Sequence, residues 1–86
     1  MDLNLNVTFQ SGVGDLTATL LRSAASETKT IGISGTIAFQ DVESGDVVSI
    51  KGECAGSATI TIDPPTFPAT PQGFGNGNIF GIYRIL

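Results

Sequence analysis

The stretch Leu3-Asn4-Leu5-Asn6-Val7-Thr8-Phe9-Gln10 alternates apolar and polar residues without a break. Successive side chains of a β-strand point to opposite faces, so a period of two predicts a strand with one face buried and the other in water. The alternation returns in run after run along the chain, and no helical periodicity competes with it. The sequence therefore predicts an all-β protein.

Further strands are predicted where the alternation resumes between Gly, Pro, Asn and Asp. Residues 28–40 are expected to form one strand bent at Gly35, with two separate strands as the alternative. The short connection at Ala55-Gly56 predicts an antiparallel pair formed by the strands on either side of it. About seven strands at this spacing predict a single antiparallel β-sandwich domain over residues 1–86. The predicted strands cover residues 3–10, 16–22, 28–34, 36–40, 47–54, 57–63 and 79–86.

The last two segments of the chain differ from the rest. Pro64–Pro71 contains four prolines, which lack a backbone N–H, so it is predicted to be a loop or crossover outside any central strand. Ile79–Leu86 is apolar on both parities. Such a strand is expected either to be central in a sheet or to pair across a subunit interface, with Arg84 facing solvent or an acidic partner.

The predicted core takes the apolar parity of each strand. Its members are Leu5, Val7, Phe9, Leu16, Ala18, Leu20, Ile31, Ile33, Ile37, Phe39, Val48, Ile50, Ile60, Ile62, Phe80 and Ile82.

Composition and charge exclude several functional classes. Charged residues make up 14% of the 86-residue chain, the net charge is −4, and the four Lys and Arg residues are scattered. Nucleic-acid binding needs clustered cations, so no nucleic-acid partner is expected. No segment has the roughly 20 apolar residues of a membrane helix, so no membrane insertion is expected. The N-terminal residues lack the basic and apolar regions of a signal peptide, which leaves an intracellular protein and a mature or excised surface domain as alternatives.

Catalytic chemistry has few candidates in this chain. It contains no His and a single Cys, which removes the usual general base and the common zinc and thiolate sites. Cys54 is expected to be a small buried apolar side chain. We therefore predict no enzyme activity, no cofactor and no metal. The turn Asp41-Val-Glu43-Ser-Gly-Asp46 holds three carboxylates that would suit Ca²⁺, with a polar turn as the favoured alternative.

A ligand or partner site, if present, is expected in the loops before the last strand. Gln72–Asn78 places an aromatic side chain between flexible glycines, with amide groups that can bond sugar hydroxyls. The residues chosen for this site are Phe67, Phe74, Asn76 and Asn78.

The stretch Thr36–Ile50 resembles the hydrophobic–x–Phe–x–x–Val–x–x–Gly–x–hydrophobic signature of prealbumin-like sandwiches. These include transthyretin-like, carboxypeptidase-regulatory-like and CnaB-type surface domains. The resemblance implies an Ig-like or prealbumin-like sandwich in which Phe39 and Val42 fill the core and Gly45 makes the turn. It implies nothing catalytic.

These features favour a non-catalytic accessory or interaction module with a protein or glycan partner, such as a domain of a larger surface protein. The alternative is a structural subunit that self-assembles through edge strands, as in a capsid, tail or fibre. Burial of Phe80, Ile82 and Leu86 within one copy would remove the reason for the second hypothesis. A homo-oligomer would pair through the C-terminal strand.

Overall fold

The computed structural model describes all 86 residues, and they form nine β-strands and no helix. This confirms the all-β prediction. The strands are β1 Leu3–Phe9, β2 Val13–Leu21, β3 Ser26–Ile33, β4 Gly35–Phe39, β5 Val47–Cys54, β6 Ala58–Asp63, β7 Thr66–Phe67, β8 Gln72–Phe74 and β9 Gly77–Ile85.

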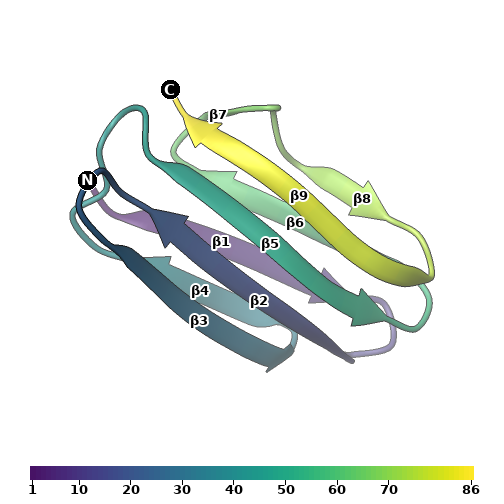
Figure 1. Cartoon of the computed structure of the whole chain (residues 1–86). Coiled ribbons are helices and arrows are strands. Elements are labelled where there is room, and N and C mark those ends of the chain that lie inside the picture. Colours follow the sequence, from purple (N-terminus) through teal and green to yellow (C-terminus); the bar gives the residue numbers. More distant parts are fainter.

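The strands form two antiparallel sheets that lie one behind the other (Figure 1). The four-stranded sheet has the order β4-β1-β6-β8, and the five-stranded sheet has the order β3-β2-β5-β9-β7. Every connection between consecutive strands crosses from one sheet to the other, except the β2–β3 hairpin. Two facing sheets support the predicted β-sandwich.

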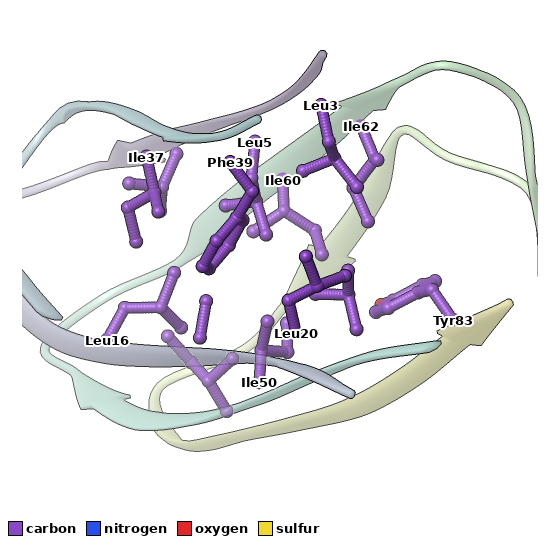
Figure 2. Close-up of a cluster of buried hydrophobic side chains, with 14 of the residues drawn as sticks. Leu3, Leu5, Leu16, Leu20, Ile37, Phe39, Ile50, Ile60, Ile62 and Tyr83 are labelled. Carbon is purple, nitrogen blue, oxygen red and sulfur yellow. The ribbon is translucent and has the colours of Figure 1, made fainter. Parts of the chain in front are cut away.

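One hydrophobic core lies between the sheets, and Figure 2 shows side chains from both layers meeting there. The alternation of β1 is reproduced in full: its apolar residues are buried and its polar residues are exposed. Complete burial of a Leu, Ile, Val or Phe side chain stabilises a fold by roughly 1.5–3 kcal/mol. The core residues are Leu3, Leu5, Val7, Phe9, Leu16, Ala18, Leu20, Ile37, Phe39, Val42, Val48, Ile50, Cys54, Ala58, Ile60, Ile62, Ile79, Tyr83 and Ile85.

The core prediction is wrong for β3. Ile33 is 62% exposed and Ile31 is only partly buried. β3 is the edge strand of its sheet, so its side chains reach the rim of the core rather than its centre. Ile33 pairs with Val13, which is also exposed, at the end of both strands.

Two expectations about connections are also wrong. β5 and β6 do not pair, because Ala55 and Gly56 carry the chain between sheets, so the two strands face each other across the core. Residues 28–40 form two strands in different sheets instead of one bent strand. The chain changes sheet at Ser34, whose Oγ accepts a hydrogen bond from the Phe9 N–H at 2.9 Å.

The proline segment lies outside the central strands, as predicted, but it and the residues after it form two short strands where only a loop or crossover was predicted. It contributes β7, and β8 follows it; both are short edge strands. In the turn before β5, Val42 is buried and Gly45 has a φ of 92°, which favours glycine.

Candidate interaction surface

The orientation of β9 decides which apolar residues remain in water. Ile79, Tyr83 and Ile85 point into the core and are buried. Phe80 and Ile82 have the opposite parity and are 67% and 54% exposed. The prediction that Phe80 and Ile82 belong to the core is therefore wrong.

The packing of Tyr83 accounts for this orientation. A side chain on Gly81 would place its Cβ 2.8 Å from the ring and hydroxyl of Tyr83, so the ring occupies space that Gly81 leaves empty. Figure 2 shows Tyr83 in the core beside β9. Its hydroxyl donates a hydrogen bond to Gln72 Oε1 of β8. Burial raises the pKa of the Tyr83 hydroxyl above its ordinary value.

The outer face of β9 carries a group of exposed apolar side chains. Phe67 of β7 lies opposite Arg84 and is as exposed as Phe80, at 67%. It is therefore diagonal to Ile82, within reach for an aromatic side chain. We call Phe67, Phe80 and Ile82 the β9 patch. Single exposed apolar residues are normal on protein surfaces, whereas neighbouring ones mark interaction sites.

Polar residues surround the β9 patch on the same sheet face. Lys51 and Ser49 of β5 lie opposite Phe80 and Ile82. Further along the face, Thr17 and Thr30 approach to 3.2 Å between their hydroxyl oxygens, and Thr19 and Thr28 approach to 3.1 Å. The β9 patch is therefore separated by polar side chains from the other exposed apolar residues of this sheet, Val13, Leu21 and Ile33, which lie at the ends of β2 and β3.

An open hollow of about 610 Å³ lies at the end of the molecule where β9 begins. Asn76, Asn78 and Glu53 line it, together with the buried Cys54. The Asn76 Oδ1 accepts a hydrogen bond from the Gly56 N–H at 3.0 Å, so part of this amide already holds two turns together. The Cys54 Sγ lies 3.6 Å from the Gly56 carbonyl oxygen and 3.5 Å from the Gly75 carbonyl oxygen, which share its single S–H donor.

The four loop residues chosen from the sequence do not form one cluster. Asn76 and Asn78 share the hollow. Phe74 lies in β8, half-buried against the core. Phe67 lies beside the C-terminal part of β9, on the outer face of the other sheet. They separate because β7 and β8 belong to different sheets.

In the acidic turn one carboxylate accepts a hydrogen bond from a backbone N–H, as in the polar turn described above. The Asp46 Oδ2 accepts a hydrogen bond from the Glu43 N–H at 2.9 Å. Arg22 lines the same hollow as Asp41, Glu43 and Asp46, and a guanidinium repels a cation. No three His, Cys, Asp or Glu side chains lie close enough together to hold a metal ion.

No protein-family model, curated protein or solved structure significantly matches this chain. The structure also contains no helix with the length and apolar character needed to cross a membrane.

Proposed function

We propose that the protein is a non-catalytic interaction module that binds its partner through the β9 patch. The observation that carries this proposal is the exposure of Phe67, Phe80 and Ile82 at neighbouring positions on one sheet face. Aromatic side chains dominate the binding energy of protein interfaces, and apolar surface beside a sheet edge suits an extended chain.

The chemistry of this surface favours a protein partner over a glycan. Lys51 and Arg84 flank the apolar residues, as charged and polar groups flank the centre of many interfaces. The hollow at Asn76 and Asn78 offers amide groups, but no aromatic side chain lines it. It is the weaker candidate for a ligand site.

A self-assembling structural subunit is the second candidate function. The observation that favours it is the exposure of Phe80, Ile82 and Leu86, since burial of all three within one copy would have removed its basis. In that case the partner on the β9 patch is another copy of the chain.

We also propose that the two-sheet fold is of Ig-like or prealbumin-like type. Support comes from the turn that precedes β5. Phe39 and Val42 are buried there and Gly45 has a positive φ, as the resemblance implies for these positions.

Selection of displayed peptides tests the interaction module. Random peptides on phage are selected on the immobilised protein, and their binding to variants is then measured. We expect peptides with apolar residues at alternate positions. Their affinity should fall at least about tenfold on the Phe80→Ser/Ile82→Ser double variant, which loses two central apolar contacts.

The matched control is Thr17→Ser/Thr19→Ser on the same sheet face, which should leave binding unchanged. Circular dichroism verifies that both variants fold. The proposal is contradicted if no peptide is selected, or if binding depends on Asn76→Ala and Asn78→Ala instead.

A further inference from the structure

β9 has an edge that no other strand covers. β7 is only two residues long and pairs with Arg84 and Ile85 alone. Along Gly77–Tyr83, β9 pairs with β5 on one side and with no strand on the other. Figure 1 shows β9 in yellow at the rim of its sheet, with β7 beside its C-terminal end only.

The backbone of β9 shows which residues face this open edge. The Ile85 N–H donates to the Asp46 carbonyl at 2.8 Å on the β5 side, whereas the Leu86 N–H donates to the Pro65 carbonyl at 3.2 Å on the β7 side. Alternate residues of a strand turn their backbone groups to opposite sides. Residues of even number in β9 therefore present N–H and C=O to the open edge, and those on the uncovered stretch are Asn78, Phe80 and Ile82.

The edges formed by β3 and β8 are protected in ways that β9 lacks. On the β3 edge, the Lys29 Nζ reaches across the rim to donate to the Ala38 carbonyl of β4 at 2.6 Å and lies 5.3 Å from the Phe39 ring centroid. A charged residue turned inward at an edge prevents strand addition. The β8 edge is three residues long and follows Pro71. Gly77–Tyr83 contains neither a charged residue nor a proline.

We propose that a second copy of this chain covers the open edge, with the two β9 strands antiparallel about a two-fold axis at Phe80. The proposal rests on the proposed function and names the partner of the same surface. Phe80 then pairs with Phe80 of the second copy, and Asn78 with Ile82 of that copy. The two five-stranded sheets become one continuous sheet.

The pattern of unpaired groups favours a second copy over an unrelated strand. Asn78 and Ile82 lie symmetrically on either side of Phe80, so this single register pairs every unpaired N–H and C=O of the open stretch. In this register Gly77 of the second copy lies opposite Tyr83, next to the Arg84 position that β7 occupies, so the second chain has to leave the sheet at the turn before its Gly77. Such self-complementarity is what a two-fold interface requires.

Charge and side chains agree with this register. Each chain carries a net charge of −4, but no charged side chain lies on Gly77–Tyr83, so no like charges face each other across the paired strands. The Phe80 rings, each 67% exposed in one copy, become a directly opposed cross-strand pair. Arg84 lies beyond the paired stretch.

The size of the contact sets its strength. Stable complexes bury roughly 1,200–2,000 Å² in total, and one short strand edge with two apolar side chains per copy provides less. The dimer is therefore expected to dissociate on dilution.

Substitution of Phe80 by residues of opposite charge tests both the dimer and its register. Molar mass is measured by light scattering from micromolar to millimolar concentration. The unmodified protein should approach twice its monomer mass at the upper end. Phe80→Lys and Phe80→Glu should each stay monomeric because like charges then meet at the two-fold axis. An equimolar mixture of the two variants should dimerise again.

Phe67→Lys is the matched control, because Phe67 is equally exposed on the same face but lies off the open edge. This variant should still dimerise. Loss of the dimer in both Phe67→Lys and Phe80→Lys would mean that the sheets stack by their faces, and would overturn the proposal. So would a protein that is monomeric throughout, or a mixture that stays monomeric. Peptides that still bind the β9 patch in that case would leave the proposed function standing with a different partner.

Discussion

At the scale of single residues, the contact between Gly81 and Tyr83 fixes the orientation of the last strand. Tyr83 is the only tyrosine of the chain, and its ring covers the position where another residue would carry a Cβ. Interiors are packed densely, so an added methyl group here has no free volume to occupy. The glycine and the tyrosine therefore act as one packing unit.

We expect Gly81→Ala to lower the free energy of unfolding by about 1–3 kcal/mol, because the new methyl group would overpack against the Tyr83 ring. Urea unfolding measures the change. Gly75→Ala is the control, since nothing lies within 4 Å of a Cβ at Gly75. Its effect should stay within about 0.5 kcal/mol. Equal effects of the two variants would contradict the packing role of Gly81.

Tyr83 also predicts a loss of stability at high pH. Its pKa is raised in the folded protein, so above the unfolded pKa of about 10 the unfolded chain releases the proton more readily than the folded chain. The contribution of the neutral Tyr83 hydroxyl to stability is fully present below that pH. It is lost as the pH rises through the raised pKa of Tyr83 in the folded protein.

The measurement is the urea midpoint of the wild type and of Tyr83→Phe between neutral pH and pH values above the ordinary tyrosine pKa. We expect the wild type to lose more stability than the variant over this range. At neutral pH the variant should be weaker by about 0.5–1.5 kcal/mol, because it lacks the hydrogen bond to Gln72. Parallel curves would argue against the raised pKa.

At the scale of elements, the alternation of β9 separates residues that hold the fold from residues that face a partner. Ile79→Ala should cost about 2–5 kcal/mol, since Ile79 is fully buried. Phe80→Ala and Ile82→Ala should each cost less than about 1 kcal/mol, the range of strand propensities at exposed sites. Thermal unfolding of dilute protein separates these cases. A large loss from Phe80→Ala in the monomer would show that Phe80 supports the fold.

The sequence held a signal for this orientation. Asn78 and Arg84 share the parity of Phe80 and Ile82, and polar residues on one parity indicate the solvent face. The number of apolar residues alone favoured burial of Phe80 and Ile82, because Gly81 lowers the apolar content of the alternate positions that are in fact buried. The alternation of β1, β5 and β6 was predictable since each has one face buried and one exposed.

The open edge of β9 was not predictable from the sequence. It depends on how little of the proline segment pairs with β9, and that is set by the path of the segment between the two sheets. The pairing of β5 and β6 was also mispredicted, because a short connection between alternating runs serves a hairpin and a crossover equally well. Sequence periodicity reports which face is buried and leaves the neighbouring strand unspecified.

At the scale of the whole molecule, a single core joins the two sheets, so they should unfold together. Tyr83 bridges from the five-stranded sheet to Gln72 of the other sheet, and the chain has no tryptophan. Tyrosine fluorescence therefore reports the contact between sheets, while far-ultraviolet circular dichroism reports the strands. We expect the two urea transitions to coincide, as in two-state unfolding. Earlier loss of the fluorescence signal would indicate that the sheets separate first.

The repeated crossing of the chain between sheets has a consequence for how the protein folds. Apart from β2 and β3, paired strands are distant in sequence: β1 meets β4 and β6, and β5 meets β2 and β9. Loop-closure entropy must be lost before such pairs gain stability, so folding is expected in milliseconds to seconds rather than microseconds. On the ribosome, β5 keeps an unpaired edge until β9 has emerged. β9 thus pairs with β5 in each new molecule before its own outer edge becomes available to a neighbour.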